Sequence, residues 1–235
     1  MMNIKRLERA LDVSSGYRFF ILYGSGIEDI FISPQGEEQT VEQALLDYLK
    51  RHGYHRVAFI APHKPVYFLD GESEELASPV RTARLPRQVR EPQIEMMYLS
   101  DGPLANRMVL KPRGADQPMP QPRTGMGDVF AIRMLDAMMR DTALCRSAVV
   151  FTQAETYLQY TDDPRTLAGV IGEWTRLPAD NPNICLFLFS ADAYEDLAEL
   201  AQRIHVPELR SFILSRRNEP SRTMNLVEIG DPEDA

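Results

Sequence analysis

Short, nearly continuous hydrophobic runs alternate along this chain with segments of helical periodicity. Continuous apolar runs of this length are typical of strands that are buried on both faces of a parallel sheet. Their alternation with helices is typical of a three-layer α/β domain. We therefore expect an α/β sandwich with a mostly parallel sheet, and its expected strands are 19–23, 29–33, 56–61, 66–69, 93–99, 148–152, 184–189, 211–214 and 225–229.

The segments between these runs place apolar residues on one helical face. Residues with capping side chains stand at several of the starts: Thr40, Asp128, Asp163 and Asp192. Their side-chain oxygens can accept the free amide protons of a first helical turn. Pro164 also fits a first helical position, and Gly53 fits a helix end. The expected helices are 5–11, 41–51, 129–140, 165–177 and 194–204.

The alternation stops between 71 and 126. Eight of the 17 prolines fall between Pro79 and Pro122, among many arginines. A segment of this length without periodicity is typical of a flexible or functional insertion. We expect one domain over 1–235 that carries a flexible Pro/Arg-rich insertion at 71–126. Its basic positions between 81 and 123 leave open a docking arm for an acidic or nucleic-acid partner.

Composition narrows the functional classes. With a net charge of −8, the chain does not favour general nucleic-acid binding, which needs concentrated Lys and Arg. Cys145 and Cys185 form no C-x-x-C pair, and the four histidines show no metal-ligand or nucleophile spacing. No apolar stretch is long enough to span a bilayer. We expect a cytoplasmic protein without a metal site, and the acidic ending at 230–235 favours a domain excised from a longer chain.

Two glycine clusters lie near hydrophobic runs, but neither has the composition of a phosphate-binding loop. Gly24-Ser25-Gly26 leads into acidic residues, and Asp128 follows Gly125-Met126-Gly127. An aspartate at a helix start satisfies the free amides that would otherwise receive an anion. The pattern G-x-x-x-x-G-K-[ST] is absent from the sequence. The usual machinery for nucleotide phosphates is therefore missing.

The order of elements from Gly127 to Leu214 nevertheless resembles bacterial AAA+ ATPases. The residues that carry this resemblance are a helix, the strand at 148–152, the helix start Asp162-Asp163-Pro164, the strand at 183–190 and Val206-Pro207-Glu208-Leu209-Arg210. The chain is more specifically similar to the degenerate N-terminal ATPase-like domain of bacterial proteins that carry a working AAA+ cassette further along. The resemblance implies a P-loop NTPase-like fold, in which 149–153 corresponds to the Walker B strand and Ser190 to the sensor 1 region.

The Walker B strand of an active P-loop ATPase ends in two acidic residues, which hold Mg²⁺ and polarise water. Thr152 and Gln153 occupy these places here, and Glu155 follows two residues later. Open α/β sheets bind ligands at the carboxyl ends of their strands. The candidate residues for binding ATP or ADP, should either bind, are therefore Thr152, Gln153, Glu155 and Ser190, and no catalytic residue is predicted.

These departures favour a noncatalytic ATPase-like domain that needs no cofactor. We expect it to mediate the assembly or regulation of an associated AAA+ ATPase, with the AAA+ cassette, other protein subunits or a second copy of the chain as partners. A nucleotide-binding domain with an unusual pocket is one alternative. A second is a signalling domain that cleaves NAD, because Asp29-Ile30-Phe31-Ile32-Ser33 and the following helix resemble the opening of Toll/interleukin-1 receptor domains.

Overall fold

The computed structural model describes residues 2–27, 30–33, 36–62, 64–83, 94–98, 108–112, 124–161, 163–215 and 223–230. The strands in these ranges are β1 (Met2–Asn3), β2 (Phe19–Tyr23), β3 (Phe31–Ile32), β4 (Glu38–Gln39), β5 (Tyr54–Ala61), β6 (Lys64–Tyr67), β7 (Ile94–Tyr98), β8 (Met108–Pro112), β9 (Arg146–Phe151), β10 (Ile184–Leu188) and β11 (Met224–Glu228). The helices are α1 (Ile4–Ala10), α2 (Val41–Arg51), α3 (Gly71–Ala83), α4 (Thr124–Arg140), α5 (Ala154–Tyr160), α6 (Pro164–Thr175), α7 (Tyr194–Arg203) and α8 (Pro207–Leu214), with a 3₁₀ turn at Ser25–Ile27.

A central sheet of six strands has the order β11-β2-β10-β9-β5-β6. The first five strands are parallel, and β6 runs antiparallel to β5. In this register Leu22 lies opposite Leu188, and Phe187 lies opposite Phe151. The carboxyl ends of the five parallel strands therefore meet at one edge of the sheet. The prediction of an α/β domain with a mostly parallel sheet is confirmed.

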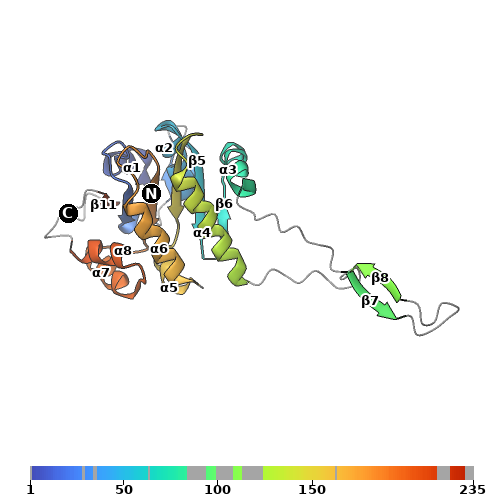
Figure 1. The fold of residues 1–235 in the computed structure, drawn as a ribbon. Coiled ribbons are helices and arrows are strands. Elements are labelled where there is room, and N and C mark those ends of the chain that lie inside the picture. Colours follow the sequence, from blue (N-terminus) through green and yellow to red (C-terminus); the bar gives the residue numbers. More distant parts are fainter. Residues whose placement is uncertain are drawn as a thin grey trace.

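Helices cover both faces of this sheet (Figure 1). Alternate residues of β2 point to opposite sides, with Phe19, Ile21 and Tyr23 in one core cluster and Phe20 and Leu22 in the other. The first cluster packs beneath α3–α8, and the second packs beneath α1 and α2. All five β2 side chains are fully buried, which explains why the strand appears in the sequence as an unbroken hydrophobic run.

Two expected helix starts are confirmed in detail. Thr40 and Gln43 form a capping box at α2, in which each side chain bonds the backbone amide of the other. Asp163 accepts a hydrogen bond from Thr166 N at 3.0 Å, and Pro164 is the first residue of α6. In both helices the polar side chain satisfies amide protons that the helix itself leaves free.

Three expected features are wrong. The expected strand at 211–214 is the end of α8, because Pro207 starts a helix whose Leu209 and Ile213 face the core four residues apart. Asp128 is no cap, since α4 begins at Thr124. Asp192 is no cap either, because the N-cap of α7 is Ala193, whose amide donates to Asp196 at 3.2 Å.

The first part of the expected insertion at 71–126 belongs to the α/β body. Its residues Gly71–Ala83 form α3, where Ser73 is fully buried and its hydroxyl oxygen accepts from Val57 N of β5 at 3.0 Å. Further along, β7 and β8 pair as an antiparallel hairpin. The ranges 84–93, 99–107 and 113–123 lie outside the described residues, as do the side chains of the basic positions between 81 and 123.

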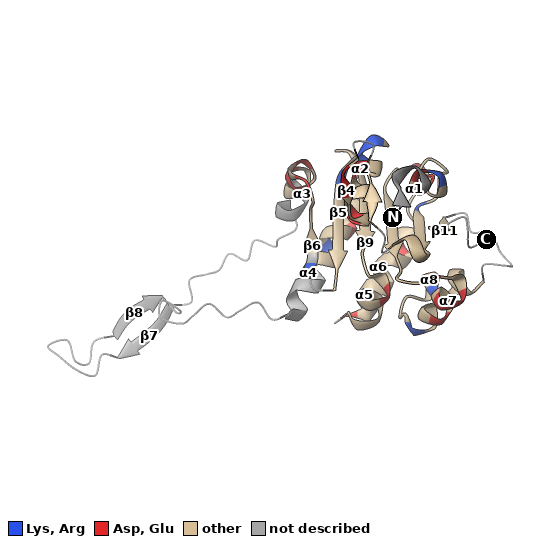
Figure 2. Cartoon of the chain, turned by 180° about the vertical axis from the view of Figure 1, so that it is seen from behind, with Lys and Arg blue, Asp and Glu red and all other residues tan. Residues whose placement is uncertain are grey.

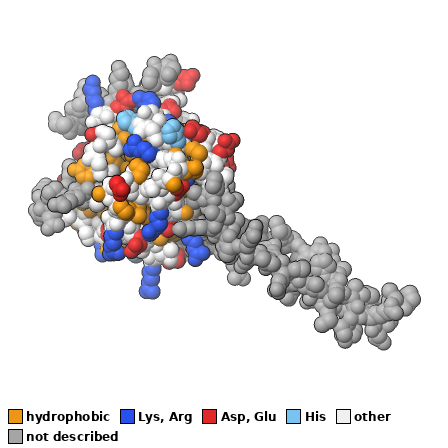
Figure 3. Space-filling model, turned by 45° about the horizontal axis from the view of Figure 1, so that its top comes forward, with side chains coloured by type: hydrophobic (Ala, Val, Ile, Leu, Met, Phe, Trp, Pro, Cys, Tyr) orange, Lys and Arg blue, Asp and Glu red, His pale blue; other side chains and the backbone are white. Residues whose placement is uncertain are grey.

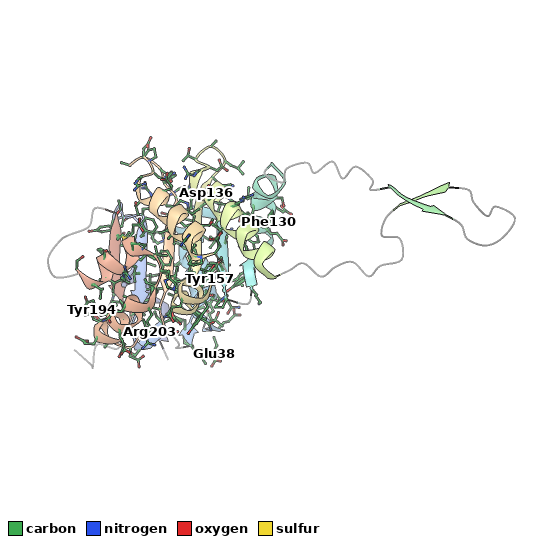
Figure 4. All side chains as sticks on the ribbon, turned by 60° about the horizontal axis from the view of Figure 1, so that its bottom comes forward. Glu38, Phe130, Asp136, Tyr157, Tyr194 and Arg203 are labelled. Atoms are coloured by element: carbon green, nitrogen blue, oxygen red, sulfur yellow. The ribbon has the colours of Figure 1, made fainter. Side chains whose placement is uncertain are left out.

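Side-chain hydrogen bonds tie the covering helices together. Asp136 of α4 accepts from Trp174 Nε1 of α6 at 3.1 Å, and Tyr194 of α7 donates to the carbonyl of Ile213 in α8 at 2.6 Å (Figure 4). Acidic side chains mark the outer surfaces of α3 and α7 (Figure 2). Within the described residues, none of the helices is long and apolar enough to cross a membrane.

Candidate functional site at the carboxyl edge of the sheet

The chain changes direction between the neighbouring strands β2 and β10. After β2 it crosses to β5 through α2, which covers one face, whereas after β10 it crosses to β11 through α7 and α8, which cover the other. In open α/β sheets a ligand crevice forms outside the carboxyl ends of two strands related in this way. The residues that follow β2 and β10 are therefore the first candidates for a ligand site.

Backbone contacts occupy the first amides after β2. Gly24 N donates to the carbonyl of Ala191 at 2.6 Å, and Gly26 N donates to the carbonyl of Ile229 at 2.8 Å. Gly24 has a φ of +121°, and a Cβ added to it would lie 2.3 Å from the oxygen of Ile229. Only glycine combines this backbone conformation with so close an approach. The peptide after β2 is thus bonded on one side to the residues after β10 and on the other side to the residues after β11, and both amides are occupied.

The start of α2 gives no open anion site either. The capping box of Thr40 and Gln43 already uses free amides of the first turn. A groove of about 380 Å³ lies beside this helix start, but Ile27 and Ile30 line it together with the acidic Glu38. Apolar and acidic side chains do not complement a phosphate. The α2 start therefore lacks the chemistry of a phosphate-binding loop.

Thr152 and Gln153 stand at the end of β9, where the resemblance places the Walker B acids. Thr152 is 6% exposed, and its hydroxyl donates to the carbonyl of Ile60 at 3.2 Å. Gln153 is exposed and has a φ of 49°, in the left-handed region, at the N-cap of α5. The two residues are adjacent in the chain, but the Thr152 hydroxyl already donates its proton to the backbone of β5.

Glu155 and Ser190 are the two candidates that the fold brings together. Glu155 lies in the first turn of α5, and its carboxylate accepts from Ser190 N at 3.3 Å. Ser190 follows β10 and is exposed. The carboxylate therefore ties α5 to the loop after β10, and this contact gives Glu155 a structural role.

Sequence reasoning missed two other polar pairs at this edge. The Tyr23 hydroxyl donates to Glu228 at 2.9 Å, and the Tyr67 hydroxyl donates to Glu42 at 2.9 Å, with Thr152 Oγ1 at 3.5 Å. Burial raises the pKa of Tyr67 to about 12, an effect that Thr152 opposes and Glu42 reinforces. The phenol therefore stays protonated and donates to the carboxylate. Each pair joins residues far apart in the chain, so no local pattern signals it.

The described residues hold no cluster for a metal ion, and their fully buried cysteine is poorly placed for nucleophilic attack. No group of three or more His, Cys, Asp or Glu that could hold a metal ion occurs among the described residues. Cys185 is fully buried in β10, and burial raises the pKa of its thiol well above the usual value. A protonated, buried thiol is a poor nucleophile. No protein-family model, curated protein or solved structure matches the chain.

Proposed function

We propose that the chain is a noncatalytic, P-loop NTPase-like domain that mediates the assembly or regulation of an AAA+ ATPase. The occupied backbone amides directly after β2 are the observation that carries this proposal. A P-loop enzyme holds its nucleotide phosphates on backbone amides directly after its first core strand. Here the amides of Gly24 and Gly26 in that region bond protein carbonyls instead.

The order of the parallel strands supports the fold assignment within this proposal. When the five parallel strands are numbered in chain order, their order across the sheet is 5-1-4-3-2. This is the order that the resemblance to an AAA+-like core implies. In that frame β9 takes the Walker B place and β10 the sensor 1 place. A domain that keeps an ATPase-like core but has its phosphate-binding amides occupied favours a role in protein contacts. A fold alone does not establish a function.

The alternatives receive less support from the geometry. A nucleotide pocket formed by Thr152, Gln153, Glu155 and Ser190 would have to break the bonds of Thr152 with Ile60 and of Glu155 with Ser190. For an NAD-cleaving domain, the resemblance places residues 29–33 at an opening core strand. β3 instead pairs with β1 and β4 outside the six-stranded sheet.

Nucleotide binding gives the first test. Calorimetry with ATP, ADP and NAD, with and without Mg²⁺, should show no low-micromolar binding at the carboxyl edge of the sheet. ATP hydrolysis that is abolished by Glu155→Ala, but kept by Glu195→Ala at an exposed position of α7, would refute the noncatalytic assignment. Cleavage of NAD, detected by product analysis, would favour the signalling alternative.

The partner role needs a second measurement. The purified chain should co-elute with an AAA+ ATPase of its own organism and change that enzyme's ATPase rate. An unrelated acidic α/β domain at the same concentration serves as the control. If every AAA+ ATPase of that organism elutes alone and keeps its rate, the proposed regulatory role is wrong.

A further inference from the structure

A second cavity lies at the opposite, amino-terminal edge of the sheet. Its volume is about 370 Å³, and its lining includes Arg18, Tyr54 and Arg146 together with the loop 179–183. These side chains stand at or just before the starts of β2, β5 and β9, so three strands and a loop shape the cavity. Figure 3 is turned so that this end of the molecule comes forward, and basic, histidine and acidic side chains all lie on it. The volume is suited to a small ligand.

Arg18 supplies a fixed positive charge to this cavity. It is 7% exposed, and its guanidinium donates to three carbonyl oxygens: Trp174 at 3.1 Å, Leu177 at 3.0 Å and Pro178 at 2.7 Å. These carbonyls belong to the end of α6 and the residues after it, and they carry only partial charges. Within the described part of the chain no carboxylate pairs with Arg18, and its buried Nε has no partner. The guanidinium is therefore held in place without a neutralising anion.

Arg146 supplies a second positive charge. Its Nη2 donates to the Tyr54 hydroxyl at 2.8 Å, and its Nη1 donates to the carbonyl of His52 at 3.2 Å. The guanidinium carbon lies 4.3 Å from the centre of the Tyr54 ring. Stacking and hydrogen bonding together fix the orientation of this side chain. As with Arg18, none of these partners is a carboxylate.

Tyr54 adds a hydrogen-bond donor. Its oxygen accepts from Arg146, and its own proton has no acceptor among the described residues. Burial raises the pKa of Tyr54 more than Arg146 lowers it, so the phenol keeps this proton at neutral pH. An anion in the cavity would accept from the phenol as well as from the guanidinium groups.

The charge balance of the lining differs from that of the whole chain. Arg18 and Arg146 contribute two positive charges, and Asp180, which is exposed, is the one carboxylate among the described lining residues. The chain as a whole has a net charge of −8. A positively charged hollow in an acidic protein attracts compact anions from solution.

We propose that this cavity binds a small multivalent oxyanion through Arg18, Arg146 and the Tyr54 hydroxyl. The shared chemistry is a cluster of negatively charged oxygens, which either a phosphate compound or a polycarboxylate provides. Pyrophosphate and citrate are therefore the two probes that distinguish these sources. This site lies at the opposite edge of the sheet from the crevice between β2 and β10. The proposal of an oxyanion site therefore does not depend on the ATPase-related proposal.

Calorimetry of the whole chain with pyrophosphate and with citrate, at constant ionic strength set by NaCl, tests the site. Saturable binding of one probe is expected. Arg146→Gln should weaken it about tenfold, since a hydrogen bond to a charged group is lost. Tyr54→Phe, which keeps the ring beneath Arg146, should weaken it several-fold.

Arg165→Gln provides the matched control. Arg165 is exposed in the first turn of α6, at the far end of that helix from the carbonyls that hold Arg18, and the substitution changes the net charge by the same amount. Its affinity should equal that of the unmodified chain. Binding of neither probe would overturn the proposal. An equal loss of probe affinity in Arg165→Gln and Arg146→Gln would also overturn the proposal, because the effect would then come from overall charge and not from this cavity.

Discussion

Replacing Gly24 with alanine should destabilise the protein strongly, because two penalties act at this one position. The φ of +121° lies where L-residues are strained, at a cost of about 1–3 kcal/mol. The new methyl group would also meet the Ile229 carbonyl oxygen at 2.3 Å, and such overpacking costs about 1–3 kcal/mol. Together they lower the free energy of unfolding by about 4 kcal/mol. In a domain of this size the thermal midpoint falls by about 8–16 °C.

Gly36→Ala separates the two penalties. Gly36 also has a positive φ, of +86°, but nothing lies within 4 Å of an added Cβ. Only the conformational cost of about 1–2 kcal/mol applies there. Urea unfolding of both variants measures the difference, which should be about 2 kcal/mol or more. Equal losses would refute the reasoning, since they would mean that the peptide after β2 is not packed tightly against Ile229.

Three further predictions concern buried charge, acid stability and a helix cap. Arg56 is fully buried and donates to Ser147 Oγ at 2.8 Å and to the partly exposed Asp141 at 2.9 Å, so Arg56→Met should cost about 1–3 kcal/mol in urea unfolding. Burial tends to raise the pKa of Asp141, but hydrogen bonds, first among them that from Arg56, hold it below the usual value. The stabilisation that ionised Asp141 contributes to the folded state is therefore present above about pH 4. It is lost as the pH falls through the lowered pKa of Asp141 in the folded protein. Thermal scans between pH 6 and pH 3 should show a smaller decline in Asp141→Asn than in the unmodified protein, and an equal decline would contradict this assignment. Thr40→Ala should cost about 1 kcal/mol because the α2 cap is lost, and Thr40→Ser should restore most of it.

The elements that local signals specify could be predicted from the sequence. β2 is fully buried on both faces, and its unbroken run of five apolar residues gave its bounds correctly. α2 was placed correctly at both ends, because Thr40 precedes an amphipathic pattern and Gly53 follows it with a φ of +81°. In each case the determining interactions lie within a few residues of the element itself.

The missed elements depend on distant partners. α3 has a weakly periodic sequence, and its best-defined contact is the bond between Ser73 and the Val57 amide of β5. Sequence reasoning could not supply that partner. The expected strand at 211–214 failed for a related reason, because a short apolar run fits a strand or a helix equally well. There Pro207 was the local clue that favoured a helix.

The candidate residues were predicted at strand ends, and their role in ligand binding stays a prediction. Fold-level reasoning placed Thr152 and Ser190 at strand ends, where they are found. The tight packing of the peptide after β2 depends on Gly24 meeting Ile229 from the other end of the chain, and no local motif encodes such a contact. The amino-edge cavity was missed because Arg18 reaches carbonyls more than 150 positions away.

The occupied amides also limit how tightly any nucleotide can bind to the backbone after β2. Entry would break the bonds of Gly24 with Ala191 and of Gly26 with Ile229, and the freed carbonyls would need new partners. Each buried polar group left unpaired costs about 1–3 kcal/mol, so opening costs about 2–6 kcal/mol. That cost weakens the apparent affinity by roughly 30-fold to 10⁴-fold. A nucleotide with an intrinsic Kd of about 1 µM would then saturate the chain only between about 30 µM and 10 mM. Saturation at low micromolar concentration would therefore indicate a site elsewhere on the protein, and Arg146→Gln would reveal whether that site is the amino-edge cavity.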